Sequence, residues 1–343
     1  MLKIIRNSSA FFILLALMLS AGAHGGESYV NVPPTVSGEW QDFLRKLPDP
    51  HLAPPYPAPD DREGWKKFRK DAEKLWKASS DAVIKRFGAT VTAAEKGGVP
   101  VVEVRPEHWK DNGKILIYLH GGGYTTGSAS STAGNPAVMA YYTGLRVISI
   151  DYTVAPEGTW DKVTDEVIAV LAALEKEGYP PGRTAIWGDS AGGGLAAGAV
   201  LKMRDRGLAM PSAAVLWCPW SDITDTGDTY ATLEKADPSY TYPRQLKHCA
   251  DAYARPGDQK NPYVSPVYGD YSKGFPPTLI QGGTKEIFLS NYVRHYQALD
   301  QAGIPVKLDL YEGMIHVFMA ILPDSPEGKR ALKKAAQFID RYL

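Results

Sequence analysis

The sequence has few cysteines, no excess of either charge and only one long apolar run, and each shortage excludes a class of protein. Among its 343 residues are two cysteines, Cys218 and Cys249, too few for a disulfide framework and without the spacing of a metal site. Two buried free thiols are favoured over a bridge between them. Basic and acidic residues balance at 38 each, so the basic excess typical of nucleic-acid-binding proteins is missing.

The single long apolar run lies at the N-terminus. Residues 10–19 are wholly apolar, follow Lys3 and Arg6, and precede an A-x-A cleavage pattern that ends at Ala23. This run is half the roughly 20 residues that a membrane-spanning helix needs. We therefore expect residues 1–23 to be a signal peptide cleaved after Ala23, and the mature protein to be periplasmic or secreted with no stable membrane span. A retained N-terminal membrane anchor is the alternative.

The rest of the chain alternates apolar strand-like runs with helical segments. This alternation predicts an α/β fold with a mostly parallel central sheet and helices on both faces. The expected strands are 89–95, 99–105, 114–119, 146–150, 184–187, 213–217, 277–281 and 306–311. The expected helices are 136–142, 163–177, 191–206, 290–302 and 327–343.

Two segments lie outside this alternation. Residues 24–88 contain a short helix at 39–47, a proline-rich connection and an amphipathic helix at 61–87 that carries Trp65 and Trp76. The segment of about 222–266 interrupts the core of residues 89–343, is rich in Tyr and Pro, and is expected to be helical. We expect the two segments to join in a cap over the strand ends. Packing on the core and roofing a pocket are both open roles for the long helix.

Residues 188–192 read G-D-S-A-G between a strand-like run and a helix rich in Ala and Gly. A strand, a sharp turn and a helix with Ser190 at the apex is the arrangement called a nucleophile elbow. Gly188 and Gly192 suit it because side chains at these positions would collide with the neighbouring strand and helix. The turn strains the Ser190 backbone and exposes its Oγ.

The run His120-Gly121-Gly122-Gly123-Tyr124 directly follows a predicted strand. Glycines let backbone N–H groups approach the oxyanion that forms when an acyl group is transferred. We expect Gly122, Gly123 and Ala191 to supply these N–H groups, with Gly121 a less favoured donor. A phosphate-binding loop does not fit, because no Lys-Ser/Thr pair follows and G-x-G-x-x-G is absent. His120 is expected to shape the loop.

A serine nucleophile needs a base, and in this arrangement the residues come in the order Ser, acid, His. Three histidines follow Ser190 in the chain. His248 falls in the 222–266 segment and His295 in the middle of a predicted helix. His316 lies in a loop directly after the last strand, where it can reach the strand ends, so it is the candidate base.

With these motifs, the chain resembles the hormone-sensitive-lipase-like (bacterial family IV) esterases of the α/β-hydrolase superfamily, from about Gly98 to its C-terminus. The resemblance implies an α/β-hydrolase core, a helical cap and hydrolysis of small-molecule carboxylic esters without a metal or cofactor. It rests on HGGGY at 120–124, DYTVAPE at 151–157, GDSAGGG at 188–194, PWSD at 219–222, NPYVSPVYGD at 261–270 and GMIHVF at 313–318.

The catalytic acid is where this sequence departs from that family. The family's acid follows the seventh core strand, where relatives often carry Asp-Glu at the positions of Lys285 and Glu286, or a single Asp at the second. Lys285 cannot accept a hydrogen bond from histidine, so Glu286 is the candidate, and its spacing to His316 is similar to that of the family. Asp309, within the last strand, and Asp300, in the preceding helix, are the rivals.

The sequence thus predicts a serine carboxylesterase with the triad Ser190, His316 and Glu286, acting on short-to-medium acyl esters. Bulky cap residues are the reason to expect short acyl chains. A lactonase or an O-deacetylase would use the same machinery. A ligand-binding receptor on this fold is less favoured, because such receptors lose the histidine and here His316 is present. The natural substrate and a homodimeric state are left open.

Overall fold

The computed structural model describes residues 29–343, so the expected signal peptide at 1–23 lies outside the described residues. At the centre of the fold lies one eight-stranded sheet with the order β1-β2-β4-β3-β5-β6-β7-β8. β2 runs antiparallel to β1 and β4, and the other neighbours are parallel, as the alternation predicted. The strands are β1 (Thr90–Lys96), β2 (Val99–Arg105), β3 (Ile115–Leu119), β4 (Arg146–Ile150), β5 (Thr184–Asp189), β6 (Ala213–Trp217), β7 (Thr278–Gly283) and β8 (Val306–Tyr311).

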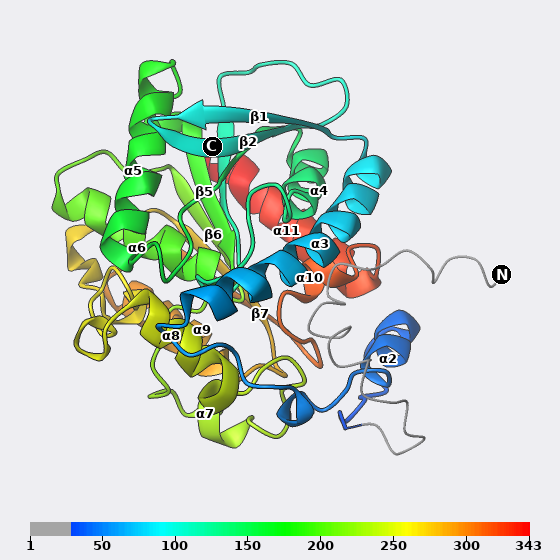
Figure 1. The fold of residues 1–343 in the computed structure, drawn as a ribbon. Helices are drawn as coiled ribbons and strands as arrows, with labels where there is room; N and C mark the ends of the chain where they lie inside the picture. Colours follow the sequence, from blue (N-terminus) through cyan, green and yellow to red (C-terminus); the bar gives the residue numbers. More distant parts are fainter. Residues whose placement is uncertain (1–28) are drawn as a thin grey trace.

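Helices cover both faces of the sheet (Figure 1). One face carries α5 (Trp160–Lys176), α6 (Ala191–Asp205) and α9 (Leu289–Gln301). The other carries α4 (Gly134–Thr143) and α11 (Pro326–Tyr342), with the short α10 (Phe318–Ile321) before α11. The central strands β3 to β7 are therefore buried on both faces, which explains why they read as continuous apolar runs.

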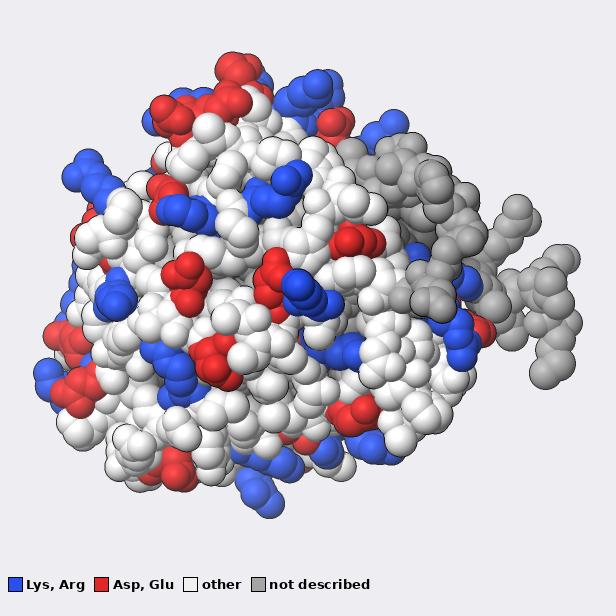
Figure 2. Space-filling model, turned by 90° about the horizontal axis from the view of Figure 1, so that it is seen from below, with Lys and Arg blue, Asp and Glu red and all other residues white. Residues whose placement is uncertain are grey.

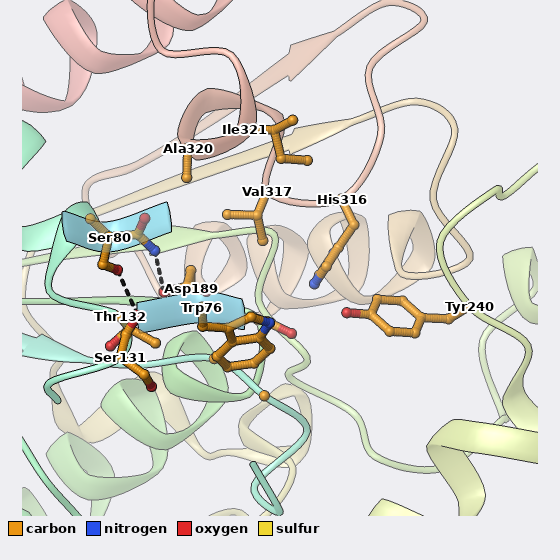
Figure 3. A pocket seen from close by; sticks show the side chains of 14 residues that line it. Trp76, Ser80, Ser131, Thr132, Asp189, Tyr240, His316, Val317, Ala320 and Ile321 are labelled. Atoms are coloured by element: carbon orange, nitrogen blue, oxygen red, sulfur yellow. Dashed lines mark hydrogen bonds between the residues drawn. The ribbon is translucent and has the colours of Figure 1, made fainter. Parts of the chain in front are cut away.

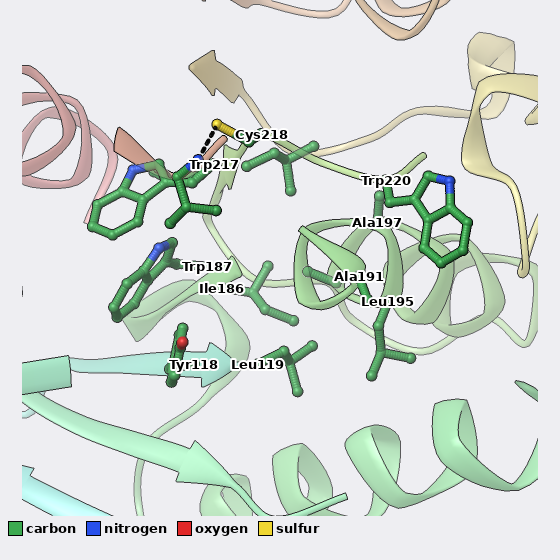
Figure 4. Packing of buried hydrophobic residues seen from close by; sticks show 14 of the residues in the cluster. Tyr118, Leu119, Ile186, Trp187, Ala191, Leu195, Ala197, Trp217, Cys218 and Trp220 are labelled. Carbon is green, nitrogen blue, oxygen red and sulfur yellow. Dashed lines mark hydrogen bonds between the residues drawn. The ribbon is translucent and has the colours of Figure 1, made fainter. Parts of the chain in front are cut away.

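The core shows how one strand serves both layers (Figure 4). Ile186 points toward α6, whereas its neighbour Trp187 points to the opposite face, because side chains alternate along a strand. There Trp187 packs against Tyr118 and Trp217, with ring centroids 4.2 and 4.8 Å away. This packing fixes β5, the strand that leads into Ser190.

The long helix α3 (Arg62–Phe87) begins and ends as the sequence indicates. The Asp61 carboxylate accepts a hydrogen bond from the Gly64 N–H at 2.8 Å, and Gly88 adopts a left-handed conformation after the last turn. Trp65 packs in an aromatic cluster with Tyr56 and Phe68, while Trp76 borders the cavity that also contains Ser190. The two open roles of α3 are therefore both filled, by different parts of the helix.

The segment 222–266 is less helical than expected. It holds only α7 (Thr229–Thr232), a π-helical turn (Tyr242–Leu246), α8 (Lys247–Tyr253) and one 3₁₀ turn (Pro256–Asp258). Proline lacks an N–H, so it is tolerated in the first turn of a helix and not in its interior. Pro243, Pro256 and Pro266 each lie in the first turn of a short helical element, and Pro238 and Pro262 lie between such elements.

This segment is joined to the chain before α3 by several hydrogen bonds. The Tyr56 N–H donates to the Arg244 carbonyl at 3.0 Å, and His248 Nδ1 lies 2.8 Å from the Tyr56 carbonyl oxygen. His51 Nε2 lies 2.5 Å from a carboxylate oxygen of Glu234. Residues far apart in the sequence thus form one layer beside α3.

None of the helices in residues 29–343 is both long and apolar enough to cross a membrane. On the face seen in Figure 2, basic and acidic side chains are interspersed rather than gathered by sign, in line with the balanced composition.

Candidate active site

Ser190 stands at a strained turn between β5 and α6. Its φ of 56° and ψ of −124° are rare for a residue with a side chain. A Cβ on Gly188 would lie 2.3 Å from the Gly192 carbonyl oxygen, and one on Gly192 would lie 2.0 Å from the Leu119 carbonyl oxygen. Neither position has room for a side chain, so the two glycines allow the turn that presents Ser190 Oγ to the cavity.

The glycine loop after β3 is fixed through its carbonyl groups. The Gly122 oxygen accepts hydrogen bonds from the N–H groups of Thr125 and Thr126, at 3.1 and 3.0 Å, and from the Thr126 hydroxyl at 2.8 Å. Gly122 and Gly123 have φ values of 116° and 62°, which only glycine adopts readily. A Cβ on Gly122 would lie 2.2 Å from the Thr126 carbonyl oxygen.

Three N–H groups near Ser190 are left without a protein acceptor. Within residues 29–343, those of Gly122, Gly123 and Ala191 make no hydrogen bond. Ala191 is the first residue of α6, where N–H groups have no partner in the helix and the helix dipole favours negative charge. Burial raises the pKa of the Asp189 carboxyl, and the nearby Gly121 N–H opposes this rise.

His120 lies beneath the glycine loop and holds its shape. Its Nδ1 is 2.7 Å from the Gly121 carbonyl oxygen, and its ring stacks on Tyr152 at 4.1 Å. The Tyr152 hydroxyl donates to the His120 carbonyl oxygen at 2.7 Å. Burial lowers the pKa of His120, so its ring is neutral and acts as a hydrogen-bonding support.

The structure brings His316 and Glu286 into direct contact. His316 Nδ1 lies 2.6 Å from Glu286 Oε2, and both side chains are buried. Glu286 also accepts hydrogen bonds from the Gly283 N–H at 2.6 Å and from the Tyr292 hydroxyl. A buried carboxylate needs such partners. By holding the Glu286 carboxylate in place, they also fix the position of the imidazole nitrogen Nδ1 that it contacts.

The second ring nitrogen of His316, Nε2, is left free by the described part of the chain. His316 Nε2 has no hydrogen-bond partner among the described residues, and His316 and Ser190 border the same cavity. Tyr240 and Phe288 approach the ring edge-on, with centroids 5.3 and 5.2 Å away. No hydrogen bond joins Ser190 Oγ to Nε2 within residues 29–343; such bonds often tighten only when substrate binds.

The rival acids are engaged elsewhere. Asp309 on β8 accepts a hydrogen bond from Gln281 Nε2 at 2.9 Å and pairs with Lys334. Asp300 is exposed on α9. Neither makes a hydrogen bond to His316, whose Nδ1 is held by Glu286.

The other two histidines also have structural partners. His248 contacts the Tyr56 carbonyl, and His295 lies 2.7 Å from the Tyr271 hydroxyl. Burial lowers the pKa of His295 to about 3, so it is neutral at ordinary pH. Neither is placed to serve Ser190.

Sequence reasoning missed the residues that hold the acid and the base. Tyr292 binds Glu286 from α9, and the Val317 N–H donates to Cys218 Sγ at 3.2 Å beside His316. Ligating atoms of Cys218, Glu286 and His316 lie within 4.8 Å of one another, but the carboxylate and Nδ1 are bonded to each other. Both cysteines are free and buried. No motif or periodicity marks these contacts: Tyr292 lies on the helix that follows Glu286, and Cys218 lies far from Val317 in the sequence.

Within residues 29–343, a larger and a smaller cavity border Ser190. The larger, of about 110 Å³, is lined by His316, Trp76 and Tyr240 and by residues of the loop before α4 (Figure 3). The smaller, of about 30 Å³, is lined by Trp76, Tyr240 and Gly123 and by apolar side chains that include Phe68, Ala72 and Leu246. His316 borders only the larger one.

The chain is similar to known hydrolases in sequence. A family model described as the alpha/beta hydrolase fold matches residues 116–320. An acetyl-hydrolase of Streptomyces hygroscopicus is 35% identical over 236 residues, which cover 69% of this chain and 78% of that protein. An esterase of Acinetobacter venetianus is 33% identical over 228 residues, which cover 66% and 74%.

Solved structures agree. The crystal structure of an esterase named E25 matches 94% of this chain and 99% of its own, with a TM-score of 0.86 and 27% identity. An esterase from the bacterial hormone-sensitive lipase family matches 80% and 91%, with a TM-score of 0.75 and 30% identity. The chain therefore belongs to the α/β-hydrolase fold family and, within it, to the hormone-sensitive-lipase-like esterases, which are carboxylic ester hydrolases.

Proposed function

We propose that the protein is a serine carboxylesterase that acts on short-to-medium acyl esters through Ser190, His316 and Glu286. One observation carries the proposal: Glu286 holds His316 by Nδ1, and the unpartnered Nε2 lies on the cavity that Ser190 borders. The glycine loop supports it with N–H groups that have no acceptor in residues 29–343. The acetyl-hydrolase named above supports a short acyl group.

The reaction begins with attack of Ser190 Oγ on the ester carbonyl while His316 Nε2 takes its proton. The N–H groups of Gly122, Gly123 and Ala191 stabilise the resulting oxyanion. His316 then protonates the leaving alcohol, and the acyl group stays on Ser190. Water, activated by the same histidine, releases the acid and restores the serine.

Glu286 takes no proton in this scheme. Its carboxylate keeps the His316 proton on Nδ1, so that Nε2 is the basic nitrogen, and it stabilises the imidazolium that forms. The Gly283 N–H and the Tyr292 hydroxyl hold the carboxylate in place. The order of the residues along the chain is Ser190, Glu286, His316, as in other enzymes of this fold.

The two cavities divide the ester. The leaving alcohol must lie beside His316, which protonates it, and so it occupies the larger cavity. The acyl chain is then left with the smaller cavity, which touches Ser190 and Gly122 but not His316. On the same measure of volume one water needs roughly 10–15 Å³, so a cavity of about 30 Å³ suits an acetyl or a slightly longer group.

We therefore expect a profile over p-nitrophenyl esters to favour acetate and butyrate over palmitate by at least about tenfold in kcat/KM. Leu246→Ala removes a buried side chain from the smaller cavity and should move the optimum to longer chains. Leu208→Ala, at an exposed leucine, is the matched control and should leave the profile alone. Faster hydrolysis of palmitate than of butyrate by the unaltered enzyme would refute the short-acyl proposal.

Two neighbouring activities use the same machinery. A lactonase would open cyclic esters, and an O-deacetylase would act on acetylated sugars, so a small panel of both belongs beside the p-nitrophenyl esters. A ligand-binding receptor would release no p-nitrophenol from p-nitrophenyl acetate.

We also propose that the enzyme is exported and that residues 24–88 and 222–266 form its cap. The A-x-A pattern at 21–23 supports export, and we expect the mature N-terminus to be His24. N-terminal sequencing of protein recovered from the periplasm or medium checks this. An intact Met1 on protein in the membrane fraction would favour an anchor instead.

A further inference from the structure

The larger cavity carries polar groups that the catalytic scheme does not use. The Tyr240 hydroxyl has no hydrogen-bond partner among the described residues, and it points into the cavity between His316 and Trp76 (Figure 3). Tyr240 borders both cavities, so its hydroxyl lies close to where the two halves of the ester meet. A hydroxyl in this position can donate to, or accept from, a group on the leaving alcohol.

A second polar group comes from the start of α4. Asn135 Nδ2 donates to the Tyr118 hydroxyl at 3.0 Å, and that hydroxyl donates to Asp189. This chain of donors fixes the orientation of the amide, which leaves Oδ1 as the remaining acceptor. Asn135 Oδ1 has no partner within residues 29–343, and Asn135 borders the cavity.

Trp76 supplies a flat apolar surface in the same cavity. An aromatic ring flanked by a few hydrogen-bonding groups suits a ligand that has both C–H faces and hydroxyls, such as a sugar ring or a polyol. Val317, Ala320 and Ile321 line another part of the wall and keep it largely apolar. The polar groups are therefore few enough to select particular hydroxyls.

An apolar alcohol would displace water from the Tyr240 hydroxyl and from Asn135 Oδ1 without replacing the hydrogen bonds that the water makes. A binding site whose polar groups need a partner discriminates strongly against a ligand that lacks the matching group. This discrimination is larger than the one that an apolar pocket makes between ligands of slightly different size. We infer that the leaving alcohol carries further hydroxyls, so that the substrate is a mono-acylated sugar or polyol, and that Tyr240 is a specificity-determining residue that binds the alcohol. This inference rests on the proposed ester hydrolysis and on the division of the ester between the two cavities.

The test compares two acetates of the same shape. One is a methyl hexopyranoside acetylated at its primary hydroxyl, and the other is cyclohexylmethyl acetate; both have a six-membered ring bearing an acetoxymethyl group. We expect the unaltered enzyme to favour the sugar ester by at least about tenfold in kcat/KM. Tyr240→Phe should lower this ratio roughly 3- to 10-fold, since it removes one hydrogen bond and keeps the ring.

The control is Tyr141→Phe, because Tyr141 is exposed on α4 and borders neither cavity. It should leave the ratio unchanged. A preference for cyclohexylmethyl acetate, or a ratio that Tyr240→Phe does not lower, would overturn the inference while leaving ester hydrolysis standing. If p-nitrophenyl acetate itself is not hydrolysed, the proposed function fails and the inference fails with it.

Discussion

Ser190→Ala is expected to lose nearly all turnover, by about 10⁴–10⁶ in kcat, while the protein folds as before. The substitution removes the attacking oxygen and nothing else, because no side-chain hydrogen bond of Ser190 supports the fold in residues 29–343. Alanine can take up the same strained turn, since it keeps the Cβ of serine and adds no other atom. The measurement is kcat on p-nitrophenyl acetate beside a thermal melt.

One outcome would rule out Ser190 as the nucleophile. A folded Ser190→Ala protein that keeps more than about a tenth of the normal rate would mean that another group attacks the ester. A lowered melting temperature would point to a loss of fold. Gly188→Ala is the comparison variant for such a loss. Its Cβ would collide with the Gly192 carbonyl oxygen, so we expect the turn itself to break.

Glu286→Gln is expected to lower kcat by about 10²–10⁴. The amide has nearly the shape of the carboxylate, but it carries no charge to stabilise the His316 imidazolium and can favour the wrong tautomer. It also meets the Gly283 N–H and the Tyr292 hydroxyl, which now donate to a carboxylate. The melting temperature serves as the folding check.

Asp309→Asn is the matched comparison. Asp309 is bonded to Gln281 and Lys334, so its change should alter stability and leave kcat near normal. If Glu286→Gln stays near the normal rate while Asp309→Asn collapses without unfolding, Glu286 is not the acid.

Much of the architecture could be predicted because it depends on local patterns. Continuous apolar runs mark strands that are covered on both faces, and the run at 146–150 is β4 to the residue. The helix expected at 191–206 is Ala191–Asp205, and the one expected at 61–87 is Arg62–Phe87. The elbow also depends mainly on local contacts. A side chain on Gly188 would collide with the backbone of Gly192, and a side chain on Gly192 would collide with the end of the adjacent strand β3.

What could not be predicted depends on contacts between distant segments. The bond from the Val317 N–H to Cys218 Sγ and the placement of Tyr240 beside His316 depend on how segments far apart in the sequence pack together. The segment 222–266 was expected to be helical, but it is mostly irregular and holds only short helical elements. No periodicity in the sequence carries this information.

In the proposed reaction Ser190 carries the acyl group between the two half-reactions. Rapid acid quenching of the enzyme during turnover of p-nitrophenyl acetate, followed by peptide mass spectrometry, measures this directly. We expect an acetyl group on the peptide that contains Ser190, and none on that peptide in Ser190→Ala. Acetylation of a different residue at the rate of turnover would contradict the assignment of Ser190.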